Sequence, residues 1–279
     1  MTALQGQWTG AGRERLARTA PMAECCAMPI EPTVLAMLAG AAGLAGVVDA
    51  IAGGGGLLTM PALLMAGLPP HEALATNKGQ SVWGAASALL RFWRSPLLDR
   101  SAAPLAFICG FLGAMGGVCL VQVVPPAVLK PLTLVLLVVA AVLAVVIRPR
   151  AGGQHRRLPL WVTAAVASVI GAYDGFFGPG TGTFLILAGL LLWRKSYDAA
   201  SADAKVVNFA SNLGALAVFA WHGQVVVLVA VVMGVAQALG GWAGAHLVVR
   251  SGAGLVRWVV VGVSVAMVGK LLVVDVLGG

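Results

Sequence analysis

The sequence predicts an all-α membrane protein, a polytopic helical bundle made of two inverted repeats of five segments each. Three observations support this prediction. First, 59% of the 279 residues are hydrophobic and only 10% are charged, whereas soluble domains carry about 25% charged residues. The mean hydropathy is +0.94, so this chain could not cover a water-facing surface. Second, apolar segments follow one another along the chain. Third, two of them are short, and each follows a glycine-rich break in its half.

The apolar segments are punctuated by proline, glycine and arginine. They span residues 33–52, 57–68, 77–92, 103–124, 129–147, 159–177, 181–193, 205–221, 224–249 and 255–274. Most are long enough to cross ~30 Å of hydrocarbon at ~1.5 Å per residue. The segments 57–68 and 181–193 would reach only about 18–20 Å as helices. We therefore expect about eight full crossings and two half-helices, one in each repeat.

The chain is expected to divide into four parts. These are an N-terminal extension (1–32), a first transmembrane repeat (33–147), a basic cytoplasmic linker (148–158) and a second transmembrane repeat (159–275). The extension carries arginines but no apolar core of a signal peptide. Met22 and Met28 are alternative starts, so the extension is given no function.

Basic residues predict the orientation in the membrane. If the two broken pairs form hairpins, or if every segment crosses, eleven Lys and Arg residues fall on one side and only Lys130 on the other, apart from the N-terminal tail. If each broken pair formed a single crossing, the count would be seven against five. The positive-inside rule favours the first arrangement, with loops 91–100 and 148–157 in the cytoplasm of a bacterium and the tail outside. Each repeat then makes an odd number of passes, so the two halves are inverted.

Several classes of function are excluded at this point. The net charge of +8 does not indicate a nucleic-acid partner, because the basic residues form short clusters between apolar segments and no basic face. The four cysteines show no metal-site spacing with histidine, and no nucleotide-binding or hydrolase motif is present. We expect no metal, no cofactor and no enzymatic activity. The lipid bilayer is an expected partner, and association into a homo-oligomer is left open.

Two irregular stretches, AGGGGLLT and GPGTGTF, are where we expect a substrate site. Irregular backbone inside a membrane is tolerated only where it is buried in protein or lines a cavity, and short glycine-interrupted segments in both halves point to a transporter's site. A helix that restarts after such a break presents free N–H groups and a positive dipole end, which attract anions. Close helix packing is the alternative role for the glycines. The expected cradle consists of Gly53, Gly54, Gly55, Gly56, Gly178, Gly180 and Gly182, with the hydroxyl groups of Thr59, Thr181 and Thr183.

Charged residues repeat around the two breaks. Asp49 and Asp174 each precede a break by four residues, and Lys78 and Lys205 follow these aspartates by 29 and 31 residues. A lysine inside a membrane is costly and indicates function, so we expect both lysines to attract an anion; snorkelling to the interface is the alternative. The aspartates would cap the backbone, pair with the lysines or carry a coupling proton. Polar neighbours that would reach the site, or instead bond between helices, are Asn77, Ser81, Asn208, Ser211 and Asn212.

The same stretches resemble the TauE/SafE sulfite-exporter family of bacterial membrane proteins, specifically its YfcA-like branch. The resemblance is carried by GLAGVVDAIAGGGGLLTMPALLMAGLPPHEALATNKGQSVWG, GAYDGFFGPGTGTFLIL and AKVVNFASNLGAL, and it runs from about residue 33 onward. It implies a helical bundle of two homologous halves with about eight crossings. It also implies passage of sulfite, sulfonates, other organosulfur compounds or small organic anions across the cytoplasmic membrane.

The sequence therefore predicts a secondary transporter of the inner membrane. A small anion would be bound at a midplane site between the inverted halves and moved by alternating access. The runner-up is an anion channel, or a membrane scaffold that transports nothing.

Overall fold

The computed structural model describes residues 31–125, 127–129, 131–133, 135–136, 139, 156 and 158–251. Within these residues every regular element is a helix, so the all-α prediction is confirmed. The N-terminal extension up to residue 30, most of the expected fifth segment and of the linker, and the whole of the last segment lie outside the described residues.

Eight helices have both ends within the described residues, four in each half. In the first half they are α2 (Pro32–Ala52), α3 (Gly56–Met65), α4 (Pro70–Trp93) and α5 (Ala103–Gln122). In the second half they are α7 (Leu160–Phe176), α8 (Thr181–Leu191), α9 (Tyr197–Trp221) and α10 (Val227–Ser251). By length and composition, α2, α5, α9 and α10 are able to cross a membrane. The two short helices, α3 and α8, have 10 and 11 residues, and they match the two short segments expected from the sequence.

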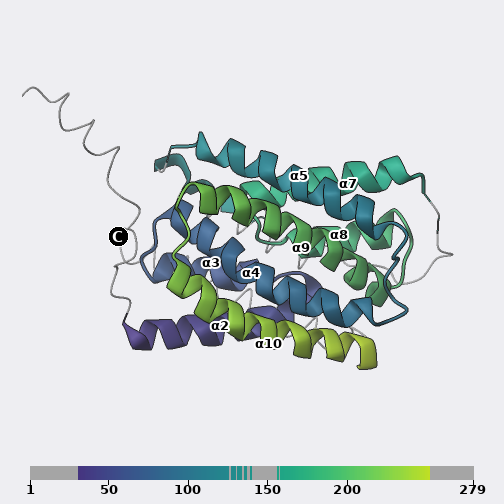
Figure 1. The fold of residues 1–279 in the computed structure, drawn as a ribbon, viewed down its shortest axis with the longest axis horizontal. Helices are drawn as coiled ribbons and strands as arrows, with labels where there is room; N and C mark the ends of the chain where they lie inside the picture. The colour runs from purple at the N-terminus through teal and green to yellow at the C-terminus, as the bar shows by residue number, and fades with distance from the viewer. Residues whose placement is uncertain are drawn as a thin grey trace, which may run out of the picture.

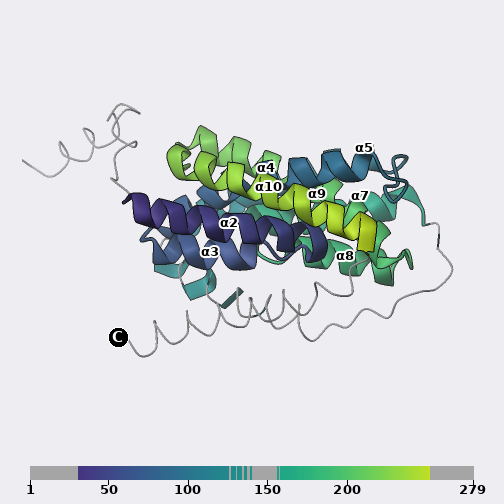
Figure 2. The ribbon, with the colours of Figure 1, turned by 90° about the horizontal axis from the view of Figure 1, so that it is seen from below.

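The two halves are interlocked (Figures 1 and 2). Helix α10 of the second half packs along α2 and α4, and helix α5 of the first half packs along α7 and α9, so each half places one long helix against two helices of the other half. Near the middle of the bundle α4 contacts α9, while α3 packs on α2 and α4 and α8 packs mainly on α9. The short helices therefore lie inside a frame of long ones.

Glycine allows the long helices to approach closely. A Cβ atom added to Gly240 of α10 would lie 2.0 Å from the carbonyl oxygen of Gly43 in α2. One added to Gly117 of α5 would lie 2.0 Å from the carbonyl oxygen of Ala172 in α7. Small residues at helix contacts are typical of membrane bundles. The packing role considered for glycine is thus observed between these long helices.

Helices α2 and α7 run toward each other from opposite ends of the bundle. Helix α2 begins at the left-hand end in Figure 1 and α7 at the right-hand end. The right-hand end also holds the end of α8, because the amide of Arg156, just before α7, donates to the carbonyl oxygen of Trp193 at 2.9 Å. Both glycine-rich breaks follow these helices, so both fall in the interior of the bundle.

The basic residues gather at one end of the bundle. Apart from the buried Lys78 and Lys205, the described Lys and Arg residues are found where α4, α8 and α10 end and where α5, α7 and α9 begin. They are Arg91, Arg94, Arg100, Arg156, Arg194, Lys195 and Arg250. Arg91 at the end of α4 donates to His246 near the end of α10 at 3.2 Å, which places these helix ends together. In the described part of the chain, the opposite end carries no Lys or Arg.

Candidate functional site

The breaks in the two halves depend on glycine conformation. Helix α2 stops where Gly53 adopts φ 73°, a left-handed conformation, and its amide donates back to the carbonyl oxygen of Asp49 at 2.9 Å. Helix α8 starts after Gly180, which has φ 86°. Residues other than glycine rarely adopt this backbone conformation, so glycine at these two positions fixes where each helix ends or begins.

The two breaks contact each other through bare backbone. A Cβ atom on Gly182 would lie 2.3 Å from the Cα of Gly53, and one on Gly53 would lie 2.0 Å from the carbonyl carbon of Gly182. Thr183 holds the contact: its amide donates to the carbonyl oxygen of Gly53 at 3.3 Å, and its hydroxyl donates to that of Ala52 at 2.9 Å. The first turn of α8 thus satisfies carbonyl groups that the end of α2 leaves without intrahelical partners.

Lys78 and Lys205 lie in the middle of the molecule. The sequence placed them at or just inside the starts of their segments, but α4 begins at Pro70 and α9 at Tyr197, so each lysine lies eight residues after the first residue of its helix. Proline at a helix start and the Ser196 side chain, which accepts from the amide of Ala199, favour these earlier starts. Only 1% of Lys78 and 0% of Lys205 is exposed, so neither snorkels to an interface.

Each lysine forms an ion pair with the aspartate of the other half. Lys78 Nζ lies 2.7 Å from Asp174 Oδ1, and Lys205 Nζ lies 2.7 Å from Asp49 Oδ2. Lys205 also donates to the main-chain carbonyl oxygen of Asp49. Of the three roles considered for the aspartates, pairing with the lysines is the one that the geometry displays, and the pairs tie the halves together crosswise.

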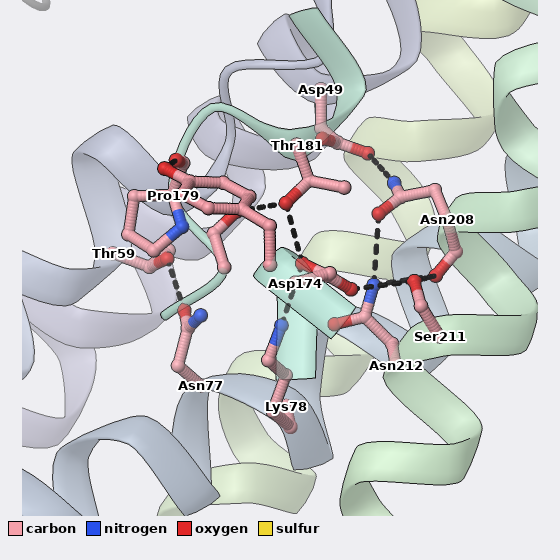
Figure 3. Close-up of polar contacts among 12 residues, drawn as sticks. Asp49, Thr59, Asn77, Lys78, Asp174, Pro179, Thr181, Asn208, Ser211 and Asn212 are labelled. Carbon is pink, nitrogen blue, oxygen red and sulfur yellow. Dashed lines mark hydrogen bonds and ion pairs between the residues drawn. The ribbon is translucent and has the colours of Figure 1, made fainter. Parts of the chain in front are cut away.

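Side chains from three helices converge on Asp174 of α7 (Figure 3). Its Oδ1 accepts from Lys78 of α4 and from the hydroxyl of Thr181 of α8, each at 2.7 Å. Its Oδ2 accepts from the hydroxyl of Ser211 of α9 at 2.5 Å. Asp174 is therefore a buried carboxylate with both oxygens occupied, and charge-assisted bonds of this kind are strong.

Asp49 has a simpler set of partners. Besides Lys205, its Oδ2 accepts from the side-chain amide of Asn208 at 3.1 Å. Asn212 supports Asn208 by donating to its side-chain oxygen at 2.9 Å and to its main-chain oxygen at 2.6 Å. Asn208 thus bonds between α9 and α2 at the edge of the site.

The hydroxyl of Thr59 does not reach the charged pairs. It donates to Asn77 Oδ1 at 2.6 Å, and the amide of Gln80 donates to the same oxygen at 2.9 Å. These contacts link α3 to α4 beside the site. Thr59 and Asn77 thereby hold the short helix against the helix that carries Lys78.

A small cavity lies between the ion pairs. Its volume is about 20 Å³, roughly enough for one water molecule. The residues that line it are Asp49, Gly53, Gly56, Asn77, Lys78, Ser81, Asp174, Gly178, Thr181, Gly182, Asn208 and Asn212. All of them were named as candidates from the sequence. Seven candidates are outside this lining: Gly54, Gly55, Thr59, Gly180, Thr183, Lys205 and Ser211.

Two supporting residues were missed from the sequence. The hydroxyl of Ser201 donates to the carbonyl oxygens of Ala50 and Ile51, at 3.0 and 3.4 Å. Ser201 precedes Lys205 by four residues and so shares its helix face, which is the signal that could have found it. The hydroxyl of Tyr173 donates to the carbonyl oxygen of Pro179 at 2.8 Å and holds the second break against α7.

Comparison with known proteins bears on this geometry. The family described as "Sulfite exporter TauE/SafE" matches residues 38–271. The chain belongs to the TauE/SafE family.

Relatives include the "Probable membrane transporter protein YfcA" of Escherichia coli (strain K12), 41% identical over 248 residues that cover 87% of this chain and 91% of that protein. The "Probable membrane transporter protein ORF9" of Sinorhizobium sp is 40% identical over 86% of this chain and 92% of that protein. A "Probable membrane transporter protein" of Haemophilus influenzae is 40% identical over 88% of this chain and 97% of that protein. No solved structure matches.

Membership in the TauE/SafE family agrees with the apolar helical bundle. The family and the names of the relatives indicate a membrane transporter and not an enzyme. The family match covers both breaks and all four members of the ion pairs. In the described part of the chain, no group of three or more His, Cys, Asp or Glu side chains is arranged to hold a metal ion.

Proposed function

We propose that this TauE/SafE protein is a secondary transporter that carries a small anion across the bacterial cytoplasmic membrane. The candidate substrates are sulfite, sulfonates, other organosulfur anions and small organic anions. The observation that carries the proposal is the pair of buried lysines held beside two contacting helix breaks in the middle of an apolar bundle. Intramembrane charges of this kind mark substrate paths.

The start of each short helix adds to the attraction for an anion. Gly56 at the start of α3 and Thr181 at the start of α8 both line the cavity. The first amides of a helix lack intrahelical acceptors and carry the positive end of its dipole. Two such ends beside two lysines form a positive setting, which the aspartates neutralise in this structure.

The size of the cavity favours a carrier over a permanently open channel. About 20 Å³ holds roughly one water molecule and no polyatomic anion. A substrate would therefore need a rearrangement that opens the site. Alternating access between two halves related by inversion is such a rearrangement. The crosswise packing of α5 and α10, and the opposite directions of α2 and α7, support the inverted relation.

The gathering of basic residues at one end of the bundle supports an orientation. By the positive-inside rule, the end that carries Arg94, Arg100 and Lys195 would face the cytoplasm. Loop 91–100 lies there. The described Arg156 lies at the same end, which agrees with a cytoplasmic linker.

The proposal is tested by uptake into proteoliposomes of sulfite, thiosulfate, methanesulfonate and acetate. Lys78→Ala should lower the affinity for the transported anion roughly 10- to 100-fold, since a hydrogen bond to a charged group contributes about 1.5–3 kcal/mol. Arg94→Ala is the matched control, because it removes an exposed basic residue beside the same helix. Equal affinity in Lys78→Ala and wild type would contradict an electrostatic site at this lysine.

Counterflow separates the alternatives. A carrier exchanges labelled for unlabelled anion faster than it makes net transport, and its flux saturates. Flux without counterflow would favour a channel. A folded protein that moves none of these anions would favour a scaffold.

A further inference from the structure

The donors around Asp174 form a cage suited to an oxyanion. An ammonium group and two hydroxyl groups, from Lys78, Thr181 and Ser211, bind its two oxygens at 2.5–2.7 Å. These donors come from α4, α8 and α9, and the carboxylate comes from α7 (Figure 3). Sulfonate and carboxylate groups use the same donors. Asp174 therefore occupies positions that the oxygens of a substrate anion would need.

The charges around the cavity cancel in this structure. Of the residues that line it, Asp49, Lys78 and Asp174 carry charge, and Lys205 behind it pairs with Asp49. Among the described residues, a further titratable group beside Asp174 is the hydroxyl of Tyr173, which donates to the carbonyl oxygen of Pro179. Two lysines and two aspartates leave no net charge to hold an incoming anion. An anion that displaced a carboxylate from its lysine would leave that carboxylate buried and unpaired, which is strongly unfavourable.

A proton on the displaced carboxylate removes this cost. We propose that the substrate and Asp174 compete for one cage, and that Asp174 takes up a proton when a monovalent oxyanion replaces it at Lys78. The carboxylate becomes a carboxylic acid, the charge of the site stays at zero, and one proton crosses the membrane with each anion. This inference rests on the proposed transport function and adds its coupling ion and the residue that carries it.

The second ion pair is less suited to such an exchange. Lys205 binds both the carboxylate and the main-chain carbonyl oxygen of Asp49. That carbonyl also accepts the amide of Gly53 and belongs to the last turn of α2. Lys205 thereby stabilises a helix end, where a cation is favourable. Asp174 is accordingly the carboxylate that the substrate anion replaces.

The first experiment uses the wild-type protein. Proteoliposomes that enclose a pH-sensitive dye are given an inward gradient of methanesulfonate, an anion that stays ionised at neutral pH and so carries no proton itself. We expect the lumen to acidify by one proton for each anion taken up, at a rate that an imposed potassium–valinomycin potential does not change. Should sulfite alone be taken up, protein-free vesicles loaded with the same amount of sulfite correct for the protons that it binds.

The outcomes separate this inference from the proposed function. Uptake without acidification, driven by an inside-positive potential, would overturn proton coupling and leave anion transport intact. Absence of uptake of every anion tested would overturn the proposed transport function itself. Acidification that depends on the anion and on the protein supports both.

The second experiment assigns the proton to Asp174. Asp174→Asn keeps the shape of the protonated side chain and removes its charge. Counterflow exchange by this variant should have an affinity independent of pH, whereas the wild-type affinity falls roughly tenfold per pH unit once Asp174 is deprotonated in the free protein. Asp99→Asn removes a carboxylate at the basic end of the bundle, outside the cavity; it is the control and should keep the pH dependence. A variant Asp174→Asn that kept the wild-type pH dependence would overturn the assignment.

If Asp174→Asn fails to fold, the number of protons taken up per anion by the wild-type protein decides whether coupling exists. Loss of the pH dependence in Asp49→Asn would then assign the proton to Asp49 and overturn its assignment to Asp174.

Discussion

The partners of Asp174 come from distant parts of the chain. Lys78 lies 96 residues before it, and Ser211 lies 37 residues after it. Sequence spacing alone identified both aspartates and both lysines as a repeated set. It could not choose a partner for each, because pairing within a half and pairing between halves satisfy the same charges. The choice is made by the tertiary fold, which brings Asp174 near the end of α7 to Lys78 of α4, and local sequence does not specify it.

Gly182 offers a test of the contact between the two breaks. In Gly182→Ala the new Cβ would lie 2.3 Å from the Cα of Gly53, a distance that backbone atoms do not tolerate. We expect a loss of about 3 kcal/mol or more in stability, together with loss of transport. Thermal unfolding of the purified protein, followed with and without methanesulfonate, measures the first effect.

Gly116→Ala is the control for this substitution. Gly116 is a helical glycine of α5, and a Cβ there would meet nothing within 4 Å. Alanine is favoured over glycine in a helix by roughly 0.5–1 kcal/mol, so this variant should be as stable as wild type or slightly more so. Equal stability of Gly182→Ala and Gly116→Ala would show that the breaks do not depend on their close contact.

The sequence predicted which helices exist better than it predicted the residues at which they begin and end. The two short helices and the breaks before them were evident from glycine runs. The starts of α4 and α9 were not, because HEALAT and SYDAAS are polar enough to be taken for loops. Pro70 and the Ser196 cap start these helices earlier, so that both lysines lie in helix interiors.

A polar contact joins the α4–α5 loop to the α8–α9 connection. Lys195 pairs with Asp203 of α9 and lies 3.5 Å from Asp99 Oδ2, and the amide of Asp99 donates to Asp203 at 2.9 Å. The hydroxyl of Ser101 donates to Asp99 at 2.6 Å. The Ser101 hydrogen bond, with the charge of Lys195, lowers the pKa of Asp99 below its ordinary value.

This lowered pKa gives a stability prediction with a definite sign. Because the folded state favours the ionised carboxylate of Asp99, its contribution is fully present above the ordinary pKa of an aspartate, about 3.9, and is lost as the pH falls below that value. Asp99→Asn should therefore lower the unfolding temperature at neutral pH. The difference in unfolding temperature between Asp99→Asn and wild type should disappear at acidic pH. An equal difference at neutral and at acidic pH would contradict the prediction.

For the whole molecule, composition and segment length were enough to predict a helical membrane bundle. The crosswise packing of α5 and α10 was not predictable from them. The packing depends on which glycine-containing helix faces pack together, and because several helices carry such faces, the sequence does not specify the pairs. The family resemblance given by the glycine motifs is confirmed by the match across residues 38–271.

The orientation in the membrane is testable by chemical labelling. In a background without the four cysteines, Ser101→Cys marks the basic end and His222→Cys marks the opposite end; both residues are exposed. A membrane-impermeant maleimide should label His222→Cys in intact cells and Ser101→Cys only after permeabilisation, since the basic end is expected in the cytoplasm. The reverse pattern would contradict this orientation.

The end of α2 also has a consequence for how the protein is made. Its last carbonyl groups are capped by Thr183, Ser201 and Lys205, and Lys205 is synthesised 156 residues after Asp49. Unsatisfied backbone groups are not tolerated in lipid. During synthesis the first half must therefore keep this helix end hydrated, or sheltered by the insertion machinery, until the second half arrives. Release of the first half alone into the bilayer should leave it a substrate for membrane proteases.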